Sequence, residues 1–102
     1  MGGQPPTYAF ESRVWCVPGD AAWHFVTLPA DVSDDIRARS DGGGRPGFGS
    51  VPVHVRVGES RWETSVFPDA RSGCYVLPLK KPVRQAEGLE EGDAVTVEVT
   101  AR

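Results

Sequence analysis

Short stretches in which apolar and polar residues alternate recur along the whole chain. The clearest is SVPVHVRVG at residues 50–58, where four valines occupy every second position: Val51, Val53, Val55 and Val57. Because successive side chains of a strand point to opposite faces, this pattern predicts a strand with one buried side. Pro52 lacks the backbone N–H that an interior strand uses, so it indicates an edge or a bulge near the start of this strand.

Five further segments are rich in β-branched and aromatic residues, and turn-forming residues separate them. Strands are therefore predicted at residues 8–17, 21–28, 51–57, 61–67, 74–79 and 94–101. The turn signal Pro18-Gly19-Asp20 joins the first two as a hairpin. Within residues 61–67 two alternatives stay open, because either the side that carries Trp62 or the side that carries Ser65 faces the core.

Two segments favour short helices. Residues 30–40 carry acids early and arginines late, an order that suits the helix dipole, with Asp31 as one possible cap. Residues 80–88 place Pro82 in a first turn and end at Gly88. Six strands and two short helices predict a mainly β fold, a small six-stranded β-barrel capped by both helices. A closed or nearly closed barrel hides the strand edges that an open sheet would expose.

The composition is that of an ordinary globular protein. The 102 residues are 39% hydrophobic and 25% charged with a net charge of -3, so nucleic acid is not the expected partner of the chain as a whole. We expect a flexible leader at residues 1–7 and a single domain over residues 8–102. No segment has the pattern of a membrane span or a secretory signal, so a soluble, cytoplasmic protein without a membrane partner is expected. Cys16 and Cys74 lack metal-ligand spacing and are interpreted as reduced thiols on strands.

Four motifs between Arg45 and Val99 carry a resemblance to a known family: GFGSVPV, WETSVFPD, SGCYVLPLKKPVR and AEGLEEGDAVTVEV. Together with AWHFVTLP at residues 22–29, their order and spacing resemble the uncharacterised bacterial family named domain of unknown function 1905. The resemblance implies a six-stranded barrel of the double-split kind, capped by short helices, with no established activity. It also implies relatives that occur alone or beside a bacteriocin-protection type domain.

The segment EGLEEGDAVTVEV at residues 87–99 is in addition similar to the C-terminal half of swapped-hairpin domains of the AbrB and MazE kind. This second resemblance covers only about a dozen residues, and shared barrel topology would also explain it. It implies an alternative function, that of a nucleic-acid-binding regulator or antitoxin-like domain. Such a function needs cations from both predicted helices on one side of the molecule.

The glycine-rich segment RPGFGS at residues 45–50 has two interpretations. It lacks the Gly-Lys-Ser/Thr ending of a phosphate-binding loop, but Arg45 and the local amides could hold an anion. The structural alternative is that Gly47 and Gly49 permit positive φ where the chain bends into the next strand, while Phe48 plugs the barrel end.

Lys80, Lys81 and Arg84 form a basic cluster at the start of the second predicted helix. Side chains and helix amides would there favour an anion together. The alternative is a solvated face on which these cations pair with Glu87 and the two glutamates that follow the helix. If the Ser65 side of its strand faces inward, its hydroxyl either orients a ligand in the lumen or bonds neighbouring backbone.

Three tryptophans, Trp15, Trp23 and Trp62, are expected to pack in the core or to form an aromatic pocket wall with Phe48. The candidate ligand-binding residues at one barrel end are Arg45, Phe48, Ser50, Trp62, Ser65, Lys80, Lys81 and Arg84. They favour a non-enzymatic domain that binds a small anionic or planar ligand, or a protein partner, at that end.

Other classes of function find less support in the residues. His24 and His54 have no carboxylate pair or cysteine at useful spacing, so neither catalysis nor a metal or other cofactor is expected. A serine such as Ser50 or Ser65 could serve as a nucleophile only with a geometry that the sequence does not show. A non-catalytic interaction module is a further possibility, which an exposed apolar patch of more than roughly a few hundred Å² would reveal.

Overall fold

The computed structural model describes residues 6–19, 23–41 and 49–102. In these residues seven strands and two helices follow one another along the chain: β1 (Thr7–Arg13), β2 (Trp15–Val17), β3 (Trp23–Thr27), α1 (Ala30–Asp41), β4 (Val51–Val57), β5 (Ser60–Asp69), β6 (Cys74–Pro78), α2 (Lys81–Glu87) and β7 (Ala94–Ala101). Neither helix within the described ranges is long and apolar enough to cross a membrane.

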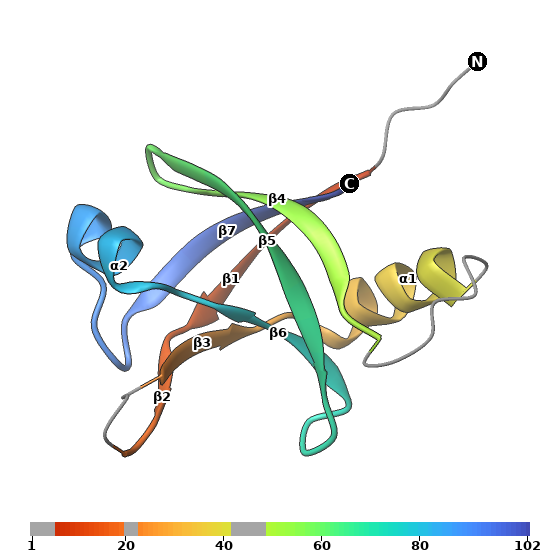
Figure 1. The fold of residues 1–102 in the computed structure, drawn as a ribbon, viewed down its shortest axis with the longest axis horizontal. Helices are drawn as coiled ribbons and strands as arrows, with labels where there is room; N and C mark the ends of the chain where they lie inside the picture. Colours follow the sequence, from red (N-terminus) through yellow and green to blue (C-terminus); the bar gives the residue numbers. More distant parts are fainter. Residues whose placement is uncertain (1–5, 20–22, 42–48) are drawn as a thin grey trace.

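The strands form one antiparallel sheet in the order β1-β7-β4-β5-β6-β3-β2. The sheet is strongly curved into a half-barrel, with α1 and α2 on opposite sides (Figure 1). The mainly β prediction is confirmed. A closed barrel of six strands is not confirmed, because in the described part of the chain seven strands are present, β1 pairs with β7 alone and β2 with β3 alone.

The extra strand arises where the first predicted strand is interrupted at Val14. The backbone N–H of Val14 donates to the carbonyl of Asp93 at 2.9 Å, and its carbonyl accepts the N–H of Gly92 at 2.7 Å. Both bonds hold Val14 against the turn before β7, whereas Trp15 already pairs with Phe25 of β3. The two outermost strands of the sheet are therefore consecutive in the chain, and one residue separates them.

Most local predictions are confirmed. The β2–β3 hairpin forms, and Gly88 ends α2 with a φ of 65°, its N–H donating to the carbonyl of Arg84. Gly49 has a φ of 73°, as the structural interpretation of the glycine-rich segment requires. Asp31 is not the cap of α1, because the helix begins one residue earlier at Ala30; its carboxylate accepts the N–H of Val32 instead.

Pro52 lies in β4, between β5 and β7 in the sheet, opposite Ser65 of β5. Its carbonyl accepts the N–H of Arg102 at 3.1 Å, so its nitrogen points towards the same neighbour, β7. The paired part of β7 ends there, with Ala101 opposite Val53. The predicted edge or bulge is not observed, because β4 is an interior strand with an unbroken register; the missing N–H of Pro52 falls at the end of the β4–β7 ladder.

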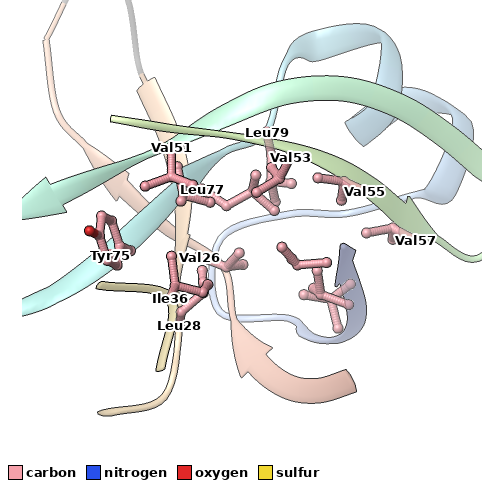
Figure 2. Packing of buried hydrophobic residues seen from close by; sticks show 14 of the residues in the cluster. Val26, Leu28, Ile36, Val51, Val53, Val55, Val57, Tyr75, Leu77 and Leu79 are labelled. Carbon is pink, nitrogen blue, oxygen red and sulfur yellow. The ribbon is translucent and has the colours of Figure 1, made fainter. Parts of the chain in front are cut away.

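The core lies on the concave side of the sheet. The four valines of β4 are buried there together with residues from the other strands and Ile36 of α1 (Figure 2). The register places Trp62 opposite Val55 and Val66 opposite Val51, and Val66 is fully buried. The Trp62 side of β5 therefore faces the core, and Ser65 lies on the outer face rather than in an apolar lumen.

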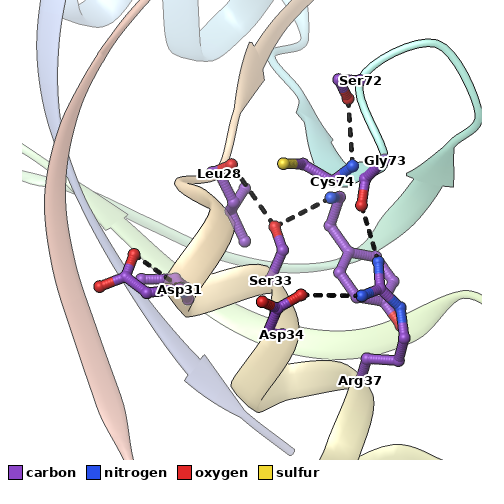
Figure 3. Close-up of polar contacts among 10 residues, drawn as sticks. Leu28, Asp31, Ser33, Asp34, Arg37, Ser72, Gly73 and Cys74 are labelled. Carbon is purple, nitrogen blue, oxygen red and sulfur yellow. Dashed lines mark hydrogen bonds and ion pairs between the residues drawn. The ribbon is translucent and has the colours of Figure 1, made fainter.

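A single buried serine fastens α1 to the sheet. The Oγ of Ser33 accepts the backbone N–H of Tyr75 at 3.0 Å and donates to the carbonyl of Leu28 at 3.4 Å (Figure 3). Arg37, one turn later, donates to Asp34 and to the carbonyl of Gly73. Its guanidinium also lies 5.5 Å from the centre of the Tyr75 ring. The helix is thus tied to the turn between β5 and β6.

Candidate functional site: a cavity between β3 and α2

A cavity of about 280 Å³ opens where β6 ends and α2 begins. Its lining comes from two segments that are far apart in sequence: Trp23, His24, Pro78, Leu79, Lys80, Lys81 and Arg84. Its volume is at the lower end of the roughly 300–1,000 Å³ that small-molecule sites occupy. A ligand of the size of one or two aromatic rings fits such a space better than a dinucleotide does.

Strand pairing brings the two segments together. Phe25 of β3 pairs with Pro78 of β6, and the N–H of Leu79 donates to the carbonyl of His24 at 2.9 Å, so the ladder continues one residue beyond β6. Lys80 keeps an extended backbone, with φ −75° and ψ 158°, and Pro82 then sets the first turn of α2. The chain therefore changes from strand to helix beside Trp23.

The walls of the cavity are largely apolar. Leu79 is buried and belongs to the main core, so it forms a fixed floor. Trp23 is 59% exposed, which leaves one face of its indole free for a flat ligand to stack on. Pro78 adds a further apolar surface beside them.

Three cations surround this apolar surface. The Nε of Arg84 donates to the carbonyl of Leu79 at 3.0 Å, a bond that holds its half-buried side chain against the end of β6. Lys80 and Lys81 are exposed, and neither forms an ion pair with an acid among the residues that the structure describes. The alternative interpretation holds in part: both lysines are solvated, but no ion pair joins the cluster to Glu87, Glu90 or Glu91 in the described residues, and the Glu87 carboxylate accepts the hydroxyl of Ser60 at 2.6 Å.

His24 adds a polar group. The Nδ1 of its ring is buried, yet it has no hydrogen-bond partner in the described chain. Buried polar atoms are almost always hydrogen-bonded, and an unsatisfied one costs roughly 1–3 kcal/mol. Because this atom is out of reach of solvent, His24 contributes to the cavity through the rest of its ring.

The helix itself adds little to the electrostatics of the cavity. The sequence predicts that the amides at the start of α2 help to hold an anion. The helix is only seven residues long, and Pro82 removes one of the N–H groups of its first turn. The positive potential of the cavity therefore comes from the side chains.

The structure places the predicted site residues in different parts of the molecule. Lys80, Lys81 and Arg84 come together in the cavity. Arg45 and Phe48 lie outside the described residues. Ser50 precedes β4, Ser65 lies opposite Pro52 on the outer face of β5, and neither lines the cavity.

Trp62 belongs to a second, larger cavity of about 540 Å³ on the sheet formed by β4, β5 and β7. Most of the charges there are paired, and Arg61 is the one lining cation without an ion pair to an acid of the described residues. Arg56 lies 3.7 Å from Glu98, and His54 lies 3.3 Å from Glu63, which Arg102 also contacts. Although it is larger, this cavity has less unpaired charge to offer a ligand than the one beside α2.

Four lining residues are absent from the predicted site: Trp23, His24, Pro78 and Leu79. Trp23 was one of three equivalent tryptophans in the sequence, and the structure separates them. Trp15 packs on Phe25 with ring centres 5.0 Å apart and donates its indole N–H to Thr27, whereas Trp23 remains exposed. A tryptophan next to the hairpin turn, at the least covered end of a strand, is the only signal that the sequence contained.

The geometry does not gather the cations that nucleic-acid binding needs. Arg37 is bound to Asp34, and Arg39 lies 3.0 Å from Asp35, so both α1 arginines are engaged with acids. The helices α1 and α2 lie at opposite ends of the molecule (Figure 1). The two histidines likewise form no pair with a serine in the described residues. His54 contacts Glu63, and Nδ1 of His24 has no hydrogen-bond partner there.

A family model described as "Domain of unknown function (DUF1905)" matches residues 10–99. The chain belongs to this family. The match covers every strand that builds the cavity as well as α2 and thus confirms the resemblance inferred from the motifs. No curated protein matches the chain at a significant level. The DUF1905 description assigns no activity, so the function has to be argued from the site.

Proposed function

We propose that this DUF1905 chain is a non-enzymatic binding domain whose cavity between β3 and α2 holds a small planar anion. One observation carries the proposal: the exposed indole of Trp23 and three cations converge on one apolar cavity. Neither lysine is neutralised by an acid in the described part of the chain. An unpaired cation beside an apolar surface attracts a ligand that is flat on its faces and negatively charged at its edge.

The residues have distinct roles in this proposal. Trp23 stacks on the ring of the ligand, and Leu79 excludes water from its other side. Lys80 and Lys81 contact the anionic group as flexible point charges, whereas Arg84 is already fixed by its bond to the Leu79 carbonyl and presents a pre-positioned fork. The ring of His24 adds to the wall of the cavity.

Matched pairs of small molecules test the charge requirement. Benzoate against benzamide, and indole-3-acetate against indole-3-acetamide, differ in charge but hardly in shape. A bound ligand at about 100 times its dissociation constant stabilises the folded state by roughly 2.7 kcal/mol, which a thermal melt detects. We expect the anions to raise the melting temperature and to change tryptophan fluorescence, and the amides to do neither.

Variants then locate the site. Lys81→Ala should weaken anion binding and Trp23→Ala should abolish it, whereas Arg61→Ala, which removes a cation from the second cavity, should change nothing. These positions are exposed, so the variants keep the fold. Equal effects of Lys81→Ala and Arg61→Ala, or equal melting shifts for acids and amides, would contradict the proposal.

A further inference from the structure

The outer face of the sheet is apolar on one side of the molecule. Residues that face each other in an antiparallel pair lie on the same face. Val17 pairs with Trp23, Trp15 with Phe25, and Phe67 of β5 with Val76 of β6. Thr27 of β3 also pairs with Val76 and so connects the two pairs of strands. We call this set the outer apolar stripe: Trp15, Val17, Trp23, Phe25, Phe67 and Val76.

The stripe lies on the side of the sheet opposite to the core. The intervening residues of β3 and β6, such as Val26 and Leu77, belong to the main core cluster, whereas Val76 is buried without belonging to it. Val76 is therefore covered by its neighbours on the outer face. The stripe forms a second, smaller apolar layer that the described part of the chain leaves partly exposed.

The rest of the outer face is polar. In the strands β1, β7 and β4, the outward positions carry residues such as Glu11, Thr96 and Arg56, all of them exposed. The exposed large hydrophobic residues of the described chain are Val17, Trp23 and Phe67, at 39%, 59% and 42% exposure. All three lie in the outer apolar stripe. Scattered exposed hydrophobic residues need no explanation, but their concentration on one face indicates an interface.

The two ends of the stripe carry opposite charges. Lys80 continues the outward positions of β6 past Pro78 and lies beside Trp23, at one end. Asp69 pairs with Cys74 at the other end, near Phe67, and its carboxylate accepts the hydroxyl of Ser72 and the N–H of Arg71 in its own turn. Six residues of extended chain separate Lys80 from Cys74, which is about 20 Å. Between these ends the stripe carries no charge.

We propose that the outer apolar stripe is the interface of a homodimer, in which a second copy of the chain packs face to face. The two-fold axis lies in the interface plane and runs across the strands at the middle of the stripe. It places the Lys80 end of one copy over the end of the other copy that carries Asp69. The other in-plane axis would place like charges together, so the charges select this arrangement.

The dimer should be weak. The stripe spans four strands, about 14 Å at the usual strand spacing, and extends about 20 Å along them. Its area is therefore smaller than the roughly 800 Å² per partner of a standard stable interface. We therefore expect a reversible monomer–dimer equilibrium in the micromolar to millimolar range. Sedimentation equilibrium over that range of protein concentration measures it directly.

Charge-introducing variants test the location of the interface. Phe67→Glu and Val17→Glu each place two carboxylates in the dimer contact and should weaken association about tenfold or more. Ala94→Glu is the matched control, because it adds the same charge at an exposed position on β7, opposite Arg13 and outside the stripe. It should leave the association constant unchanged.

A second pair of variants tests the axis. Lys80→Glu should weaken the dimer, and Lys81→Glu, the neighbouring lysine at the start of α2, should affect it much less. Added salt should weaken the wild-type dimer but not the Lys80→Glu variant. Phe67 and Val17 do not line the ligand cavity, so their variants separate this proposal from the proposed function.

A chain that stays monomeric up to millimolar concentration would overturn the dimer proposal, and the stripe would then have to face a different partner. Association that Phe67→Glu leaves unchanged, or that Ala94→Glu weakens as strongly, would overturn it as well. Equal losses from Lys80→Glu and Lys81→Glu would overturn the proposed axis.

Discussion

Ser60 and Glu87 connect the turn between β4 and β5 to the last turn of α2 by one hydrogen bond. The glycine beside them, Gly58, has a φ of 57°, a region that side-chain-bearing residues rarely adopt. A Cβ added there would lie 2.1 Å from the Oε1 of Glu87. Gly58 is thus required twice, by the turn and by the carboxylate that passes over it.

The variant Gly58→Ala should therefore destabilise the protein by about 2–3 kcal/mol, from the strained φ and from displacement of the Glu87 carboxylate. Gly73→Ala is the matched control. Gly73 has a φ of 74° but nothing within 4 Å of an added Cβ. Gly73→Ala should therefore lower the free energy of unfolding by only about 1–2 kcal/mol. Urea unfolding measures both. Equal losses of unfolding free energy in the two variants would show that the contact with Glu87 does not affect stability.

Ser33 is the one fully buried polar side chain among the described residues, and its hydroxyl accepts the N–H of Tyr75. Ser33→Ala leaves that N–H buried without a partner, so we expect a loss of roughly 1–3 kcal/mol in urea unfolding. Ser72→Ala removes a hydroxyl that also accepts a backbone N–H, that of Cys74, but at an exposed position. Its loss should be smaller, and a larger loss for Ser72→Ala would contradict the assignment.

At the scale of elements, α1 is held from both sides. Ser33 and Arg37 fasten it to the β5–β6 turn, while Asp35 fastens it to β1 by accepting the hydroxyl of Tyr8. Asp35 also lies 3.0 Å from Arg39. The Tyr8 hydroxyl, and after it Arg39, lowers the pKa of the Asp35 carboxyl. Burial, and after it the hydrogen bond to Asp35, raises the pKa of Tyr8.

These shifts give the attachment of α1 to β1 a pH dependence. Because the folded-state pKa of Asp35 lies below its ordinary value of 3.8, the carboxylate stabilises the fold above that pH and loses this effect as the pH falls through the folded pKa. Tyr8 has the opposite sign: its contribution is present below its ordinary pKa of 10.0 and is lost as the pH rises through the raised value.

Asp35→Asn should therefore unfold at a lower urea concentration than the wild type at neutral pH, and the difference should shrink as the pH falls below 3.8. Asp34→Asn removes the same charge from the same helix without touching Tyr8, and serves as the control. A difference between Asp35→Asn and the wild type that stays constant down to acid pH would contradict the linkage.

At the scale of the whole molecule, the sheet has two unlike outer surfaces. Over β1, β7 and β4 it is polar, and ion pairs join most of the charges there. Over β2, β3 and β6 it is apolar, with unpaired lysines at one end. Both proposed interactions, with a planar anion and with a second copy, lie on this side. Trp23 and Lys80 belong to both, so ligand binding and self-association are expected to influence each other.

Much of the fold was predictable because its signals are local. The alternating valines of β4 and β7, the turn residues between strands, and the Pro82 and Gly88 that bound α2 all act within a few residues. The predicted number of strands was wrong, because seven strands form in the described residues instead of six. The interruption at Val14 depends on the turn before β7, nearly eighty residues away, and no local pattern reports such a contact.

The candidate site was predictable only in part, for the same reason. The basic cluster of α2 is contiguous in sequence, and so it was found. Its partners on β3, Trp23 and His24, join it only through the pairing of β3 with β6. The side of β5 that faces inward was also undecided, because both of its faces are partly apolar until the register with β4 places Val66 in the core.

The sequence by itself determined which segments extend, where they turn and which family the chain resembles, because period-two alternation and turn chemistry depend on neighbouring residues alone. Tertiary structure decided which tryptophan stays exposed, which charges remain unpaired and which apolar face is left open. These properties arise from pairing between distant strands, since exposure and charge neutralisation depend on what the fold brings alongside each residue.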